Sequence, residues 1–292
     1  MFQKQSFLFS LFLATALFAG EVQYAKGNFS MSAGLANLQQ NYDVEITTYS
    51  LLQNHQNIFS SNYYYRYNIS WYDSQTMVDT QNQVNRLLSD FSTPLVSSSY
   101  TPQMNYRMQG LDVNTVLGYD LYHKDENNYF GVGIMLGISL PWIDSKDENS
   151  DSSTDTDTTL LKETKTEIMT YKIGPTLSLA TSYNKHFILY ATATYAYQTG
   201  WITNSYVDSD FNVDGVFQEY DIGLKLQPLS EEYKMGWFTL SPRLYFTAGY
   251  RYTEWQLNDV DSKLLGQDLI LPPIDFTMNT SLAYLGFGYS FF

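Results

Sequence analysis

Histidine is the side chain best suited to general acid–base catalysis near neutral pH, and this chain contains three, His55, His123 and His186. None of them stands in a His-Glu-x-x-His motif, and no Gly-x-Ser-x-Gly motif occurs in the chain. The sequence also lacks a nucleotide-binding glycine loop, a haem motif and a zinc spacing. We therefore predict that the protein is not an enzyme and binds no cofactor.

A second chemical candidate is the acidic segment 143–167. It carries Asp144, Asp147, Glu148, Asp151, Asp155, Asp157, Glu163 and Glu167. Oxygen-rich loops can bind calcium, but the stretch DSSTDTD lacks the glycine and the terminal glutamate of a calcium-binding loop. We therefore predict that this segment is a solvated surface loop that repels the anionic cell surface, and that it holds no metal site.

Charged side chains also recur along the chain at positions that alternate with apolar ones. They are Asp112, Asp120, Lys172, Glu219, Asp221, Lys225, Arg243 and Arg251, and Tyr190, Tyr245 and Tyr284 share their phase. In an extended strand, this alternation separates charged and apolar side chains onto opposite faces. Because a lone buried charge is costly, we expect acids and bases to pair, for example Asp221 with Arg243.

The segments that carry these charges are predicted to be long β-strands. In residues 130–140, Phe130, Ile134 and Ile138 lie on one face, whereas Gly131 and Gly133 lie on the other. Similar alternation occurs in residues 111–121, 169–179, 187–201, 220–226, 238–252 and 285–291. Strands of about 9 to 11 alternating residues, many ending in aromatic side chains, are typical of transmembrane β-barrels.

Composition supports a membrane barrel and excludes other classes. Charged residues make up 16% of the chain and Tyr and Phe are abundant, whereas ordinary soluble domains are about 25% charged. The formal net charge of −14 argues against a nucleic-acid partner, which requires a basic face. Residues 7–19 (FLFSLFLATALFA) follow Lys4 and are too short to span a bilayer as a helix. Residues 1–20 are therefore predicted to be a secretory signal peptide, cleaved after Ala19 or Gly20.

The lengths of the connections predict the orientation. Residues 123–128, 182–186 and 227–236 are shorter connections, and they alternate with the longer segments 143–167, 203–215 and 253–276. Outer-membrane barrels have short periplasmic turns and longer outer loops, so the C-terminus is expected in the periplasm.

The last strand carries a family resemblance. The sequence LAYLGFGYSFF resembles the C-terminal signal that the barrel-assembly machinery reads in bacterial outer-membrane barrels, with Tyr289, Phe291 and Phe292 as its aromatic residues. The family signal ends in a single Phe in phase with the outward face, whereas here Phe292 follows the in-phase Phe291. The size resembles that of the OmpA, OmpX and OmpW type of barrel, and this resemblance implies location in the outer membrane of a Gram-negative cell. Outer-membrane lipids and the assembly machinery are then the expected partners.

The number of strands depends on residues 38–104. Residues 29–35 alternate and give one strand, and seven follow from residue 105, which makes eight. Residues 61–72 are strand-like with two polar or aromatic faces, and residues 76–90 suggest a polar helix. Because both termini are expected in the periplasm, a tenth strand would have to lie within residues 75–103, which contain Pro94 and Pro102. We therefore predict eight strands, with residues 38–104 as an extracellular insertion, and keep ten strands as the alternative.

An eight-stranded barrel has room inside for side chains and little more. The predicted function is a structural or surface-binding one, with an extracellular ligand as partner and a lumen closed by ion pairs. The alternative is a narrow porin-like channel for cations or small polar solutes.

Overall fold

The computed structural model describes residues 20–35, 38–58, 61–78, 104–122, 127–147, 165–204, 209–229, 231–235, 238–240, 243–264, 267–269 and 274–289. The predicted signal peptide (up to residue 19), His123, Phe291 and Phe292 lie outside these ranges. Within them, no helix is long and apolar enough to cross a membrane.

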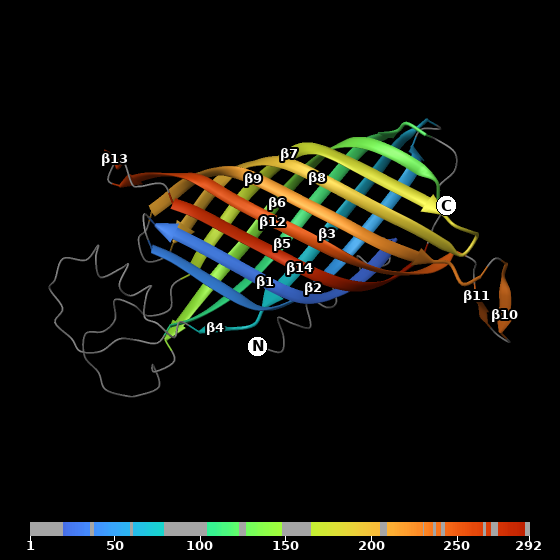
Figure 1. The fold of residues 1–292 in the computed structure, drawn as a ribbon, viewed down its shortest axis with the longest axis horizontal. Helices are drawn as coiled ribbons and strands as arrows, with labels where there is room; N and C mark the ends of the chain where they lie inside the picture. Colours follow the sequence, from blue (N-terminus) through green and yellow to red (C-terminus); the bar gives the residue numbers. More distant parts are fainter. Residues whose placement is uncertain are drawn as a thin grey trace.

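The chain forms a closed antiparallel barrel of ten tilted strands (Figure 1). Around the ring they are β1 (Glu21–Leu35), β2 (Leu38–Ile58), β3 (Tyr63–Ser74), β5 (Met104–Asp120), β6 (Tyr129–Asp147), β7 (Lys165–Ser182), β8 (Phe187–Asn204), β9 (Ser209–Leu226), β12 (Leu244–Leu264) and β14 (Ile274–Tyr289). Pairing of β1 with β14, and of β12 with both β14 and β9, closes the sheet without a free edge. This closure satisfies the backbone hydrogen bonds that a lipid environment cannot.

Four short strands lie at the two ends of the barrel. The hairpin of β10 (Tyr233–Met235) and β11 (Phe238–Leu240) lies at the end where β14 finishes, here called the C-terminal end. At the opposite, distal end, β4 (Met77–Val78) pairs with β5, and β13 (Gln267–Leu269) pairs with β12. Residues 238–240 were expected to begin a spanning strand, but they belong to the hairpin, and the spanning strand begins at Leu244.

The predicted antiparallel up-and-down barrel is confirmed, but the predicted eight strands and the insertion after the first strand are wrong. Residues 38–58 and 63–74 are barrel strands β2 and β3, so only the shorter connection between β3 and β5 remains as an insertion. The expectation of an even number of barrel strands is confirmed, because the barrel has ten. The extra strand lies before residue 61, not after residue 75, where it was expected. β2 escaped detection because its outward face carries Asp43, Glu45 and Thr47, which hide the apolar alternation.

The wall of the barrel follows the expected inside–outside alternation. On β6, Ile134 is 58% and Leu136 is 56% exposed, whereas Met135 between them is 2% exposed. The same outward apolar face continues on neighbouring strands, with Leu117 on β5 and Ile173 on β7 exposed. Exposed aliphatic side chains around a closed barrel form the belt that contacts lipid acyl chains, so the protein is a transmembrane β-barrel of the outer-membrane type.

Inward glycines make room for large aromatic rings. The Tyr64 side chain of β3 is fully buried, and a Cβ atom at Gly118 or Gly131 would overlap its ring. Gly133 also lies close to the Tyr64 hydroxyl. The lumen therefore requires glycine at these positions because a larger side chain would take the space of the tyrosine.

The inside–outside pattern inverts toward the distal end. On β12, Trp255 and Leu257 are buried inside the barrel, and the alternation turns the polar Glu254 and Gln256 outward. Nearer the C-terminal end of the same strand, the exposed Tyr250 faces outward and the buried Arg251 faces inward. A polar exterior around an apolar interior is the pattern of a water-exposed barrel, so the distal part of the barrel extends beyond the membrane. The strand lengths agree, because β2 and β12 each have 21 residues and about 9 to 11 suffice to span a bilayer.

Replacement of Ile134 by Arg tests the assignment of the lipid belt. We expect Ile134→Arg to lower the free energy of unfolding in lipid vesicles by about 2–4 kcal/mol, the cost of a cation near mid-membrane on the lipid face. Gln256→Arg, at an outward position of the distal part, should leave it nearly unchanged. Equal effects of the two substitutions in urea titrations would contradict the assignment.

Candidate functional site

The clearest candidate site is the polar interior of the barrel near its C-terminal end. Arg251 on β12 donates hydrogen bonds from Nε (3.0 Å) and Nη2 (2.8 Å) to Oδ2 of Asp221 on β9. These two residues are directly paired in the strand register, and both are buried. A hydrogen-bonded guanidinium and carboxylate satisfy each other in a poorly screened environment.

Neighbouring strands extend this pair into a network. Tyr284 on β14 donates from its hydroxyl to Asp221 Oδ1 at 2.6 Å, and Tyr190 on β8 lies 2.7 Å from the Tyr284 hydroxyl. On the other side, Arg251 Nη2 donates to Oε1 of Gln23 on β1 at 2.9 Å. The network therefore ties together five consecutive strands, from β8 through β9, β12 and β14 to β1.

The first residues of β1 complete the network. Gln23 donates from Nε2 to Glu21 Oε1 at 2.7 Å, and the same carboxylate accepts a hydrogen bond from Thr247. The carbonyl of Gly20 accepts hydrogen bonds from the Tyr289 amide (2.7 Å) and the Tyr245 hydroxyl. The seam between β1 and β14 is thus held by side-chain hydrogen bonds as well as by the backbone pairing of the two strands.

A second ion pair lies on the opposite side of the lumen. Nζ of Lys172 on β7 is 3.2 Å from Oδ1 of Asp112 on β5, with no exposed surface on the lysine side chain. Ser139 on β6 also donates to Asp112 and receives a hydrogen bond from Nε1 of Trp255 at 3.1 Å. Because β7, β8 and β9 separate β6 from β12 around the ring, the bond between Trp255 and Ser139 crosses the interior.

Aromatic and sulfur-containing side chains surround this crossing. Lys172 Nζ lies 3.9 Å from the centre of the Phe217 ring, and Phe217 packs edge-on against Trp255 at 5.8 Å. The interior toward the distal end continues as an apolar cluster. Its buried members there include Phe29, Ile46, Met77, Met108, Ile168, Val213, Leu257 and Met278.

The charged residues singled out in the sequence separate into two groups. Asp221 with Arg251 and Asp112 with Lys172 form the two buried pairs. The partner expected for Asp221 was Arg243, but Arg243 is exposed in the turn before β12. The remaining members of the set are Asp120, Lys225 and Glu219.

These three residues have other environments. Asp120 is buried and accepts hydrogen bonds from the backbone amides of Tyr122 (3.0 Å) and Phe130 (3.2 Å), so it caps the connection between β5 and β6. Lys225 lies 4.1 Å above the Tyr245 ring, and Glu219 is half-buried on β9. Of the aromatic residues in the predicted assembly signal, Tyr289 is exposed on the outer wall at 36%.

Several network members were not singled out in the sequence. Glu21 and Gln23 come just after the predicted signal peptide and were assigned only as the start of the predicted mature chain. Ser139 belongs to the alternating segment 130–140, whereas Trp255 lies in residues 253–276, which were expected to form a connection, and no local pattern indicates that the two meet across the lumen. Alternation indicates the inward phase of Ser139 but not that of Gln23, which shares the phase of the apolar Phe29 and Met31.

Other candidates for chemistry have simpler structural explanations. His186 lies in the turn between β7 and β8 with Nδ1 2.7 Å from the Gln227 carbonyl, and His55 on β2 contacts Gln53. Within the described ranges, no three His, Asp or Glu side chains gather closely enough to hold a metal ion. Most of the acidic segment 143–167 lies outside those ranges.

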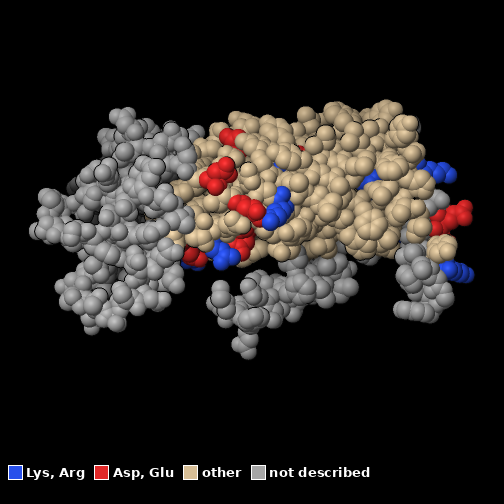
Figure 2. Space-filling model, turned by 60° about the horizontal axis from the view of Figure 1, so that its bottom comes forward, with Lys and Arg blue, Asp and Glu red and all other residues tan. Residues whose placement is uncertain are grey.

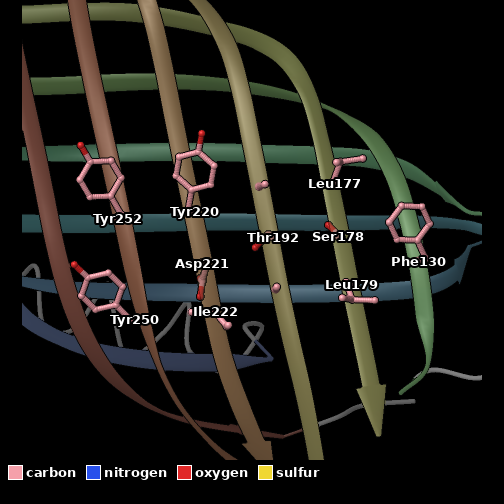
Figure 3. A pocket seen from close by; sticks show the side chains of 12 residues that line it. Phe130, Leu177, Ser178, Leu179, Thr192, Tyr220, Asp221, Ile222, Tyr250 and Tyr252 are labelled. Atoms are coloured by element: carbon pink, nitrogen blue, oxygen red, sulfur yellow. The ribbon is translucent and has the colours of Figure 1, made fainter.

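The outer wall has a shallow groove of about 350 Å³ across β8. Its floor is formed by the small side chains of Ala191 and Ala193. Figure 3 shows Leu177, Leu179 and Phe130 on one side and Tyr220, Ile222, Tyr250 and Tyr252 on the other. The groove lies on the lipid-facing side, and Asp221 at its base turns into the lumen toward Arg251. We therefore place the candidate site in the lumen and not in this groove.

Comparisons with known proteins find similarity in architecture only. No family model matches the sequence, and no curated protein sequence matches it. Among solved structures, the outer membrane protease OmpT from Escherichia coli is 9% identical, with a TM-score of 0.46 over 92% of this chain and 96% of that chain. The toluene transporter TbuX of Ralstonia pickettii is 11% identical, with a TM-score of 0.34 over 94% and 91%. Ail, the attachment invasion locus protein of Yersinia pestis, is 10% identical, with a TM-score of 0.29 over 92% and 98%.

Proposed function

We propose that this chain is a non-conducting, non-enzymatic outer-membrane barrel that presents its distal end at the cell surface for a structural or surface-binding role. The observation that carries this proposal is the hydrogen bond from Trp255 to Ser139, which joins nearly opposite walls. A ten-stranded barrel is wider than the eight-stranded one expected from the sequence, so its closure depends on side chains that reach across the lumen.

Two features of the interior support closure. The pairs of Arg251 with Asp221 and of Lys172 with Asp112 neutralise the charges that could otherwise draw ions and water inward. Toward the distal end, the apolar cluster around Phe217 and Leu257 fills the interior with side chains that do not hydrate an ion. The two features meet where Lys172 lies over the Phe217 ring, and together they fill the interior.

The extended distal part supports a surface role. Its outer wall is polar, and strands such as β6 and β12 continue well beyond the length that a bilayer requires. The distal end is proposed to face outward because the longest connection, between β3 and β5, lies there and outer-membrane barrels carry longer loops outside. This orientation agrees with the proposed removal of the signal peptide and with a periplasmic C-terminus. Recognition of Tyr289, Phe291 and Phe292 by the assembly machinery remains part of the proposal.

Electrical recording in planar lipid bilayers tests the closed lumen. We expect no stable conductance steps from the wild-type protein, because its interior is filled by the cross-lumen contacts. Combined replacement of Trp255 and Phe217 by Ala should produce measurable steps, which shows that inserted barrels are detected. Large, stable, cation-selective steps from the wild type would overturn closure and favour the alternative of a narrow cation channel.

A further inference from the structure

The lipid-facing belt is uneven around the barrel. On β6, outward apolar side chains follow one another from Phe130 to Trp142. On β1, Ala25 and Phe29 point inward, so the outward face offers Val22 and Tyr24 and then turns polar at Lys26. The belt is therefore much shorter beside β1 than beside β6.

The belt is also short on β2, and on β14 it ends at Ala283. On β2, the exposed Tyr49 is followed toward the distal end by Thr47, Glu45 and Asp43 on the same outward face. On β14, the outward Leu285 and Ala283 are followed in that direction by Ser281 and Asn279. Figure 2 looks onto this side of the barrel and shows charged side chains gathered along one stretch of it, beside an uncharged band. We call the outward residues Lys26, Asn28, Asp43, Glu45, Thr47, Asn279 and Ser281 the polar face.

A short belt has a physical consequence in a bilayer. A hydrophobic surface shorter than the hydrocarbon layer forces the layer to thin, or is hidden by association with another protein. Here the belt is shortest on β1 and β2, beside the polar distal part of β14, whereas β6 and β7 on the far side match a full bilayer. Contact between two such sides would remove both short belts from lipid at once.

We propose that the polar face is the contact surface between two copies of this chain in the membrane. A two-fold contact requires a surface that complements itself, so that a residue i meets j while j meets i. The face offers Lys26 and Glu45 on adjacent strands, with their side chains 53% and 37% exposed although they pair within one copy. Lys26 of each copy can therefore also face the acidic residues of the other, and Asn28 and Asn279 supply both donors and acceptors.

This inference requires only that the barrel is embedded in a bilayer. Conduction by the wild type would overturn the closed lumen without affecting the contact surface. Conversely, a monomeric barrel can be fully closed, so the two proposals fail separately.

The chain contains no cysteine, which allows clean single-site cross-linking. Asn28→Cys places a thiol on the polar face of β1, and the matched control Thr199→Cys places one on the exposed outward side of β8, across the barrel. Both variants are treated with a short bismaleimide in native membranes, and heat-modifiable gel mobility shows that each is folded. We expect the Asn28→Cys variant to give a dimer at least tenfold more abundant than the Thr199→Cys variant.

Reversal of the charges on the polar face distinguishes a specific contact between two copies from chance proximity in the membrane. In the Asn28→Cys background, Lys26→Glu should reduce the cross-linked dimer severalfold, and the exchange of Lys26→Glu with Glu45→Lys should restore it. Equal cross-linking at both cysteine sites would overturn the proposal, as would products that contain only other proteins. Folded Asn28→Cys protein that stays monomeric would also overturn it and favour thinned lipid beside β1.

Discussion

Arg251→Ala is expected to lower the free energy of unfolding by about 3–5 kcal/mol, because it leaves the Asp221 carboxylate buried without its cation. The same substitution also removes the hydrogen bond to Gln23 and so loosens the seam between β12, β14 and β1. The measurement is the urea midpoint and slope in lipid vesicles, followed by tryptophan fluorescence.

A matched control distinguishes burial from loss of an ion pair as such. Arg107 on β5 forms a bidentate pair with Asp73 on β3, but its side chain is 47% exposed. Arg107→Ala should cost only about 0–1 kcal/mol, the usual value for an exposed pair. If the Arg251 and Arg107 variants lost the same stability, the buried network would not hold the barrel together as argued.

Gly131→Val is expected to prevent formation of the folded barrel or to destabilise it by about 3 kcal/mol or more. A side chain at Gly131 on β6 would occupy the position of the Tyr64 ring, which is fully buried and also packs against Gly118. The amount of heat-modifiable protein in outer membranes measures assembly, and urea titration measures the stability of any folded fraction.

The contact with Tyr64 predicts a specific rescue. Tyr64→Ala combined with Gly131→Val should restore much of the folded protein, because the smaller side chain on β3 frees the space that valine needs. Val132→Ile, at the neighbouring outward position, should be tolerated. Failure of the double variant to recover, with Tyr64→Ala itself folded, would indicate that Gly131 is needed for its backbone and not for the space it leaves.

Alternation in the sequence by itself determined the fold class and most of the barrel wall. In β5, β6, β7 and β9, apolar side chains on one face oppose glycines or polar residues on the other, and this period of two is local to each strand. It therefore predicted that Ile134 faces outward and Met135 inward without knowledge of any neighbour. It also predicted which charges share the inward phase, including Asp112 and Arg251.

Only the tertiary structure decided how many strands close the ring. Near its distal end β2 turns Asp43 and Glu45 outward and Val44 and Ile46 inward, the reverse of a lipid-facing strand, so its membership depends on hydrogen bonds to β1 and β3 rather than on its own pattern. The distal part of each strand also inverts its polarity as it leaves the membrane. A local pattern cannot distinguish that inversion from a loop.

The pairing inside the lumen was likewise a tertiary property. Arg243 and Arg251 share the same inward phase on one segment, and the sequence gives no reason to prefer either as the partner of Asp221. The register between β9 and β12 places Arg251 directly beside Asp221 and leaves Arg243 at the preceding turn. The contact of Trp255 with Ser139 depends on curvature of the closed sheet, which brings residues far apart in sequence across the lumen. Local periodicity fixes which way a side chain points, whereas strand register and closure fix what it meets.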